Sequence, residues 1–145
     1  MRPGRTILLV LFFALIGIQF IEVERTNPPV TDEIKAPTDI MEILKKSCYD
    51  CHSNETVWPW YSKVAPVSWL VEDDVTEGRK HLNFSTFESL DTSVKLKKKD
   101  EILEEVQNGE MPLDIYTLIH PNANLELLQI AKIEKWVTGK SRMTN

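Results

Sequence analysis

The residues of this chain whose types and spacing can do chemistry stand in one run, Cys48-Tyr49-Asp50-Cys51-His52. Two cysteines three positions apart lie on one turn of a helix, so they can reach the two vinyl groups of a single porphyrin and form thioethers. The histidine that follows lies under the iron and offers a ring nitrogen as its proximal ligand. The pattern C-x-x-C-H is typical of covalent attachment of a c-type haem.

The sequence gives less support to the other roles that these five residues could have, which are a redox pair, a zinc site or a disulfide. A redox C-x-x-C pair is expected at the start of a helix after a strand, and no stretch alternates apolar and polar residues long enough to indicate a strand. A zinc site needs about four ligands, whereas the chain has two cysteines and three histidines. A disulfide that precedes a histidine by chance is the remaining alternative.

The sixth iron ligand decides what a haem at this motif does, because two protein ligands favour electron transfer and an open position binds gas or peroxide. Met111 lies 59 residues after His52, in a Gly-x-Met-Pro loop that follows the expected end of a helix. Its thioether is a soft ligand that raises the reduction potential. A gap-filling core methionine is the alternative interpretation of this residue. His120, His81 and an open site stay as alternative occupants of the sixth position.

The N-terminus predicts a membrane anchor. Arg2 and Arg5 precede an uncharged run from Ile7 to Ile21, extendable to Val23. Such a run is near the length of a membrane span. No small-x-small cleavage site follows it, so we expect an uncleaved helix whose positive end stays inside. A buried core helix is the alternative.

The remaining chain predicts an all-α domain. Pro28, Pro29 and Pro37 disfavour helix and indicate a linker. Glycines and a capping asparagine divide the rest, with Gly78 expected to stop one helix and Asn83 to cap the next element. We expect helices from Thr38 to the motif, over Ser68–Glu77, over Thr92–Asn108 and over Leu125–Val137. The expected organisation is an anchor over 1–26, a linker over 27–37, the haem domain over 38–138 and a tail over 139–145.

Composition bounds the class of protein. The chain has 145 residues, 42% hydrophobic, and a net charge of −5. The first 26 residues hold three basic and two acidic side chains, which leaves 14 basic and 20 acidic, or −6, for the folded part. An acidic domain argues against nucleic acid as a partner, and two cysteines exclude a multi-disulfide scaffold.

The motif and its surroundings resemble the bacterial haem-binding domain family, from about Gln19 to Trp136. The resemblance implies a c-type haem protein, with Cys48 and Cys51 as attachment points, His52 as proximal ligand and Met111 as distal ligand. Phe87 and Glu126 stand where the family commonly has Trp and Ser, which are packing and capping differences. The matching runs are Asn27-Pro28-Pro29, Leu44 to Thr56, Trp58-Pro59-Trp60-Tyr61, Pro66-Val67-Ser68-Trp69, Gly78-Arg79, Asn83-Phe84-Ser85, Met111-Pro112, Tyr116 and His120-Pro121.

Several further side chains are candidates for the haem pocket, each with an ordinary structural role as the alternative. Large aromatic rings can wall a macrocycle, and an N–H or O–H of theirs can reach a propionate. The second ring nitrogen of His52 needs a partner, for which a carbonyl in the Pro59–Pro66 segment is a candidate. Lys45 and Lys46 can dock an acidic partner or simply be solvated. The candidate pocket residues are Trp58, Trp60, Tyr61, Trp69, Arg79, Tyr116 and His120.

Together these patterns predict a small class I cytochrome c-like helical domain around one haem, preceded by a transmembrane helix. We expect a monohaem electron carrier rather than an enzyme, single-pass in the bacterial inner membrane with its C-terminal domain in the periplasm. Its expected partners are lipid, through residues 7–23, and a redox protein of the membrane or periplasm. A haem-based ligand sensor or small peroxidase with a displaceable distal ligand is the alternative function.

Overall fold

The computed structural model describes residues 3–139. The predicted tail beyond Gly139 and Arg2 of the predicted anchor lie outside this range. The described chain is helical and contains no strand, so the predicted all-α class is confirmed. Its elements are α1 (Pro3–Gly17), η1 (Ile18–Phe20), α2 (Thr38–Ser47), α3 (Tyr49–His52), η2 (Trp60–Lys63), α4 (Val67–His81), η3 (Phe84–Ser89), α5 (Thr92–Asn108), α6 (Asp114–Ile119), η4 (Pro121–Ala123) and α7 (Leu127–Thr138), where η denotes a 3₁₀ helix.

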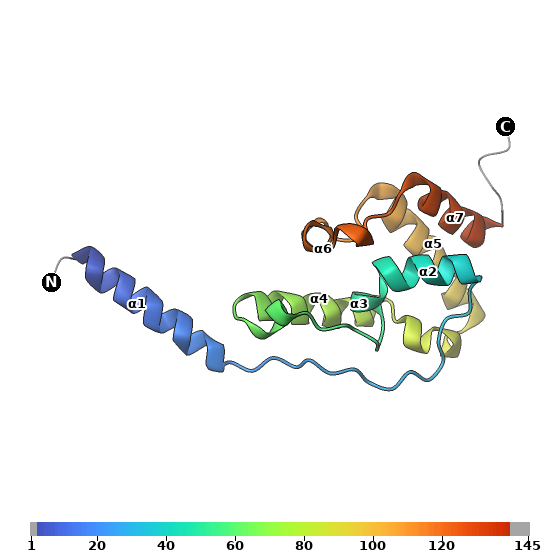
Figure 1. Cartoon of the computed structure of the whole chain (residues 1–145). Helices are drawn as coiled ribbons and strands as arrows, with labels where there is room; N and C mark the ends of the chain where they lie inside the picture. Colours follow the sequence, from blue (N-terminus) through green and yellow to red (C-terminus); the bar gives the residue numbers. More distant parts are fainter. Residues whose placement is uncertain (1–2, 140–145) are drawn as a thin grey trace.

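The first helix lies apart from all the others (Figure 1). None of the residues of α1 is buried, although leucine, isoleucine and phenylalanine make up much of it. Together with η1 it forms a continuous apolar stretch over Pro3–Phe20, 18 residues, which is long and apolar enough to cross a membrane. An apolar helix without a protein partner needs another apolar environment. The alternative of a buried core helix is therefore wrong.

The core of the domain lies where α2, α5 and α7 pack together with η3 (Figure 1). Apolar residues of α2 recur at helical spacing and are turned inward, as Ile40, Ile43 and Leu44 show. Phe84 and Phe87 of η3 close the core from the other side with almost no exposed surface. The buried cluster consists of Ile34, Ile40, Ile43, Leu44, Tyr49, Phe84, Phe87, Ile102, Val106 and Ile133.

The ends of the helices show which local signals were decisive. The helix over Thr92–Asn108 has its predicted bounds, and it ends where Gly109 adopts a left-handed conformation with φ 75°. The Asn83 side chain accepts a hydrogen bond from the Ser85 amide, as expected of a cap, although the element it caps is a 3₁₀ helix. Gly78 was predicted to stop α4 and does not, because α4 continues to His81. This glycine has a packing role that is described below.

The segment between the anchor and α2, residues 21–37, runs along the surface of the domain (Figure 1). The side chain of Asn27 donates to the Thr56 carbonyl at 2.9 Å, and that of Asn54 donates to the Pro29 carbonyl at 2.9 Å. Further on, the amide of Ile34 donates to the Phe84 carbonyl at 2.8 Å. The predicted linker is thus extended chain with polar contacts to the domain along its length. We refer to residues 21–37 as the strap.

Candidate functional site

The C-x-x-C-H motif forms a helical turn directly after α2. The Cys48 amide donates to the Leu44 carbonyl at 2.8 Å, which closes α2, and the His52 amide donates to the Cys48 carbonyl at 2.9 Å, which closes α3. Tyr49 within the motif is buried and stacks on Phe84 with ring centroids 5.2 Å apart. The core therefore holds the motif from one side through its first variable residue.

The His52 ring is held by two backbone carbonyls. Its Nδ1 lies 2.9 Å from the Gly78 oxygen and 3.2 Å from the Leu82 oxygen. Carbonyl oxygens only accept hydrogen bonds, so Nδ1 carries the proton and Nε2 presents its lone pair. Burial lowers the pKa of His52, although the two carbonyl contacts oppose the shift. The result is a neutral imidazole in the tautomer suited to metal ligation.

The carbonyls that orient His52 belong to Gly78, in the C-terminal half of α4, and to Leu82, directly after it, so the interpretation that placed the partner in the Pro59–Pro66 segment is wrong. The segment contributes to the site in another way, through the cleft described below. The reason for the error is that α4 runs past Gly78 and ends near the ring, with Leu82 immediately after its last turn.

Gly78 permits the close approach of α4 to α3. A Cβ added at this position would lie 2.6 Å from the Cys51 carbonyl oxygen and 3.2 Å from the Cys51 Cβ. Only a residue without a side chain fits at such a distance. Gly78 thus both accepts the His52 hydrogen bond and leaves room for the backbone of the motif.

Both cysteines are free thiols in this structure. Burial raises the pKa of Cys48 to about 12, and the neighbouring Cys51 adds to the shift. The pKa of Cys51 is also raised to about 12, by burial and then by the carboxylates of Asp74 and Asp50. The sulfur atoms are accordingly neutral at physiological pH and shielded from ordinary thiolate reactions.

A cleft opens beside Cys51, lined by residues of α4 and α6. One wall is the apolar face of α4, in which Val67, Leu70, Val71 and Val75 recur at helical spacing. The opposite wall comes from α6 and its flanks. The complete lining is Asp50, Cys51, Thr56, Val57, Pro59, Tyr61, Val67, Leu70, Val71, Asp74, Val75, Leu113, Ile115, Tyr116, Ile119 and His120.

Four polar side chains of this lining are paired with one another. The Tyr116 hydroxyl donates to the Asp50 carboxylate at 2.7 Å, and the Tyr61 hydroxyl lies 2.6 Å from His120 Nε2. The rings of Tyr116 and His120 are stacked, with centroids 4.6 Å apart. Burial and the bond to Asp50 raise the pKa of Tyr116. Tyr116 and His120 are four residues apart in the sequence, but nothing local pointed to Asp50, which faces α6 only after folding.

The structure brings three of the seven candidate pocket residues to the cleft: Tyr61, Tyr116 and His120. Trp69 falls on the opposite side of α4 from the cleft-lining valines, at about 100° per residue, and its buried indole N–H has no hydrogen-bond partner among residues 3–139. Trp60 is 77% exposed. Trp58 lies near the Arg79 guanidinium, which is 5.9 Å from the indole ring.

The Arg79 guanidinium, a candidate for a propionate, instead bonds within the chain. Its Nε donates to the Ser53 carbonyl at 2.7 Å, directly after the motif. Its two other nitrogens donate to the Thr26 carbonyl, the Asn27 side chain and the Thr56 hydroxyl, at 2.8 to 2.9 Å. Arg79 therefore joins the motif loop to the strap.

The candidates for the sixth ligand differ in their surroundings. Met111 is half-buried in the turn that follows α5, two residues before the cleft-lining Leu113. His120 lines the cleft, with Nε2 engaged by Tyr61. The His81 side chain is 79% exposed and faces Glu77 at 3.9 Å. Of the three, His81 is thus the one on the surface.

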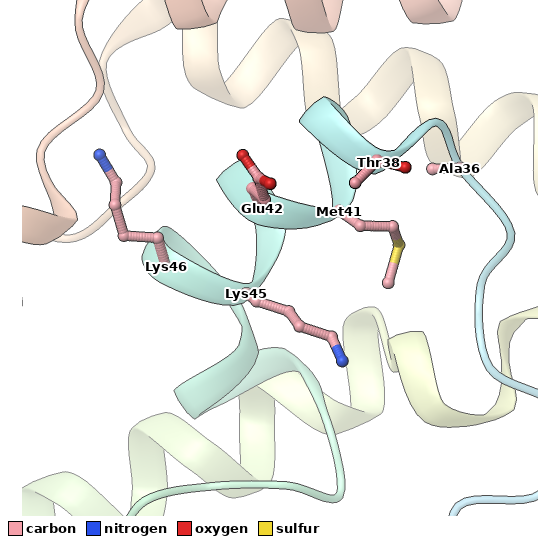
Figure 2. Close-up of a pocket in the computed structure, with 6 residues that line it drawn as sticks. All are labelled: Ala36, Thr38, Met41, Glu42, Lys45 and Lys46. Carbon is pink, nitrogen blue, oxygen red and sulfur yellow. The ribbon is translucent and has the colours of Figure 1, made fainter.

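A second hollow, shallow and open, lies on α2 (Figure 2). Met41 and Lys45 extend to one side of the helix and Lys46 to the other. Lys45 lies 3.6 Å from the Glu33 carboxylate, and Lys46 is 3.4 Å from the Gln129 side chain. Both lysines therefore have partners within the chain, and we assign no function to this hollow.

The residues present fit a haem rather than a zinc ion. Within residues 3–139 no three side chains of the His, Cys, Asp and Glu types come together as a metal site. A neutral, carbonyl-held imidazole, two unpaired thiols on one turn and an adjacent apolar cleft are what a covalently attached haem requires. An all-helical domain built around such a motif defines a haem-binding protein.

The chain belongs to the haem-binding domain family, whose model matches residues 13–139. The match covers the last turns of the anchor, the strap and the entire helical domain. No curated protein and no solved structure shows significant similarity to the chain. The family thus confirms haem binding.

Proposed function

We propose that this protein is a membrane-anchored, monohaem c-type cytochrome that transfers single electrons. The observation that carries the proposal is the pair of carbonyl contacts to His52 Nδ1, which leaves Nε2 for the iron. Haem binding is a property of the family. The covalent linkage, the axial ligands and the redox role are proposed on the geometry.

Cys48 and Cys51 attach the haem in this proposal. Each thiol adds across one vinyl group, so that a carbon–sulfur bond forms and the thiol hydrogen passes to the other vinyl carbon. No oxidant is consumed. The reaction needs free thiols, and both cysteines are unpaired.

Met111 is the proposed sixth ligand. When bound, the haem supplies a one-electron couple, and a thioether ligand raises its potential. The apolar wall of α4 excludes water from the site, and the carbonyls of Gly78 and Leu82 fix the orientation of the His52 imidazole. With both axial positions filled, the protein carries electrons between a membrane redox protein and a periplasmic one and has no substrate of its own.

A ligand sensor or small peroxidase is the second candidate, and one observation favours it. The cleft wall opposite α4 carries Tyr61, Tyr116 and His120, hydrogen-bonding groups that could exchange their present partners for a bound diatomic or peroxide. Such a role requires that the sixth ligand be absent or easily displaced.

The anchor places the domain outside the cytoplasm in this proposal. Arg5 precedes an apolar stretch that is long enough to span a bilayer, and a positive N-terminal flank stays in the cytoplasm. The domain is then on the periplasmic side of the bacterial inner membrane, where c-type haem is attached.

The deciding experiment is an optical spectrum of the full chain, matured in a bacterial periplasm with haem-attachment machinery and solubilised in detergent. We expect a c-type haemochrome that survives denaturation, and none in the Cys48→Ala/Cys51→Ala double variant. A low-spin spectrum with the near-infrared band of sulfur–iron ligation supports Met111 and electron transfer. A high-spin spectrum that shifts with carbon monoxide favours the sensor or peroxidase. A colourless wild-type chain overturns the covalent haem.

A further inference from the structure

The end of the apolar helix is fastened to the haem domain. In η1, the Gln19 side chain donates to the Ala65 carbonyl at 3.0 Å and accepts from the Ala65 amide at 3.0 Å. An amide side chain thus pairs with both polar backbone groups of one residue, as a neighbouring strand would. Ala65 lies in the turn between η2 and α4 and is itself buried.

The strap continues this attachment. Arg25 donates to the Ser62 carbonyl at 3.2 Å, and Asn27 donates to the Thr56 carbonyl at 2.9 Å. Three consecutive portions of the chain, from η1 to the start of the strap, therefore contact the same part of the domain, residues 56–65. These hydrogen bonds set the orientation of the domain relative to the apolar helix.

The segment next to this attachment exposes large apolar side chains. We name residues 57–67 the η2 loop. Val57 is 75% exposed, Trp60 77%, Val64 44% and Val67 41%. A tryptophan exposed to solvent to this extent on a small domain indicates a surface that a membrane or another molecule covers.

The charge of the η2 loop differs from that of the domain that carries it. Residues 57–67 contain one lysine, Lys63, which is exposed, and no acidic residue. The folded part as a whole carries −6. An apolar, weakly cationic loop on an acidic domain matches the boundary of a bilayer with anionic headgroups, where Trp is enriched.

The length of the helix puts the loop at that boundary. Pro3–Phe20 is 18 residues, or about 28 Å of helix, close to the roughly 30 Å thickness of the hydrocarbon core. With Pro3 at one boundary of the hydrocarbon core, Gln19, the last residue but one of this stretch, lies close to the opposite boundary. Ala65, hydrogen-bonded to Gln19, cannot then lie far from the same surface.

We propose that the η2 loop is a lipid-binding surface, which inserts Trp60 and Val64 into the headgroup region of the membrane that holds α1. This inference rests on the proposed membrane anchor. It adds that the domain has one fixed orientation on the bilayer. Because Val57, Pro59, Tyr61 and Val67 of the loop also line the cleft, the haem site opens close to the membrane surface, within reach of a partner embedded in the same bilayer.

Lipid photolabelling of the haem-loaded full chain tests the proposal. The chain is reconstituted in phosphatidylcholine–phosphatidylglycerol vesicles that contain a phospholipid with a diazirine in its headgroup region. After illumination, mass spectrometry locates the adducts. We expect them on residues 57–67 at several times the level on α5, whose exposed face is the internal reference.

Two variants separate orientation from anchoring. Gln19→Leu removes both bonds to Ala65 and leaves the helix apolar, so adducts on the η2 loop should fall several-fold while the chain stays in the vesicles. Gln107→Leu makes the same exchange at an exposed site on α5 and should change nothing. The haem spectrum of each variant shows that the domain is folded.

The outcomes distinguish failure of the inference from failure of the anchor. Adducts confined to residues 3–20, with the η2 loop no more labelled than α5, overturn the inference and leave the anchor standing. A chain that alkaline carbonate releases from the vesicles overturns both. Equal labelling of the loop in wild type and Gln19→Leu overturns the part assigned to the Gln19 attachment.

Discussion

The Gly78 carbonyl oxygen accepts a hydrogen bond from His52 Nδ1 at 2.9 Å, while the missing side chain of the same glycine lets the Cys51 backbone approach α4. One residue thus fixes both the tautomer of the proposed iron ligand and the spacing between α3 and α4. The two roles depend on each other, because an α4 displaced from α3 would also carry its carbonyl away from His52.

Gly78→Ala tests this relationship. Within a helix that exchange normally stabilises by up to about 1 kcal/mol. Here the added Cβ would lie 2.6 Å from the Cys51 oxygen, so we expect a loss of about 1–3 kcal/mol from overpacking and a lower yield of haem-loaded protein. Denaturant unfolding of the solubilised chain measures the first quantity and the haemochrome absorbance the second.

A fitting comparison is Thr76→Ala, two positions earlier on α4, which removes only a bond to Glu72 on the same helix. It should change stability by less than about 1 kcal/mol. If Gly78→Ala proved as stable as wild type or more so, the close approach of the two helices would not exist in solution.

Met111→Ala addresses the sixth ligand. We expect retention of covalent haem, loss of the near-infrared sulfur–iron band, a change of spin state and a lower reduction potential, because the soft thioether favours the reduced iron. Optical and redox titration measure these properties. His120→Ala is the matched variant, since it removes the other candidate in the cleft. A spectrum altered by His120→Ala and untouched by Met111→Ala would reverse the assignment.

Tyr116→Phe tests how α6 is held over the motif. The variant removes the bond to Asp50 and keeps the ring stacked on His120. A hydrogen bond to a charged group contributes about 1.5–3 kcal/mol, and we expect a loss in the lower part of that range because the pair is only part-buried. Tyr61→Phe, which removes the bond to His120, should cost less. Thermal unfolding compares the two, and equal losses would argue that the Asp50 charge contributes nothing.

Glu88→Gln tests the acid sensitivity of the strap. Glu88 accepts from Lys95 at 2.9 Å and from the Lys35 amide at 3.2 Å, and these contacts, the Lys95 bond first, lower its pKa below the ordinary value near 4.5. A lowered folded-state pKa stabilises the fold above pH 4.5 and loses that contribution as the pH falls through the folded value. We expect the free energy of unfolding of wild type to exceed that of the variant by about 0.5–1 kcal/mol at pH 7. This difference should decrease as the pH falls. A gap that widens towards low pH would contradict the pairing.

Local signals predicted those parts of the fold that depend on neighbours in sequence. The bounds of α5 follow from Gly109, whose left-handed conformation ends the helix, and the face of α2 follows from apolar spacing. The prediction that Gly78 ends α4 was wrong because a glycine can either end a helix or allow a close helix–helix contact. Here the contact with the Cys51 backbone, which is distant in sequence, determines its role. The six-residue α6, between Pro112 and Pro121, is too short for a periodic pattern to reveal.

The C-x-x-C-H motif could be predicted from the sequence because its residues are adjacent in the chain. The groups that hold it in place come from distant parts of the chain. The carbonyls for His52 lie 26 and 30 residues further along the chain. Residues 27–37 of the strap were predicted as a linker because their prolines disfavour helix, and this segment is not helical in the structure. Nothing local indicates whether an extended segment is free or bound to the domain. The partners of the strap, such as the Thr56 and Phe84 carbonyls, are backbone groups that carry no signature in the sequence.

Arg79→Lys tests whether the strap is joined to the motif through one side chain. The guanidinium donates to the Ser53 carbonyl at 2.7 Å and reaches the strap at Thr26 and Asn27. A lysine keeps the charge, but its single ammonium group cannot span these acceptors. We therefore expect the strap to detach more readily, with faster proteolytic cleavage around residues 25–30 and a loss of about 1–3 kcal/mol of stability. Lys80→Ala, at the next position and paired only with Glu77 on the surface, is the control and should leave the cleavage rate unchanged. Equal cleavage rates in wild type and Arg79→Lys would show that the other contacts hold the strap without Arg79.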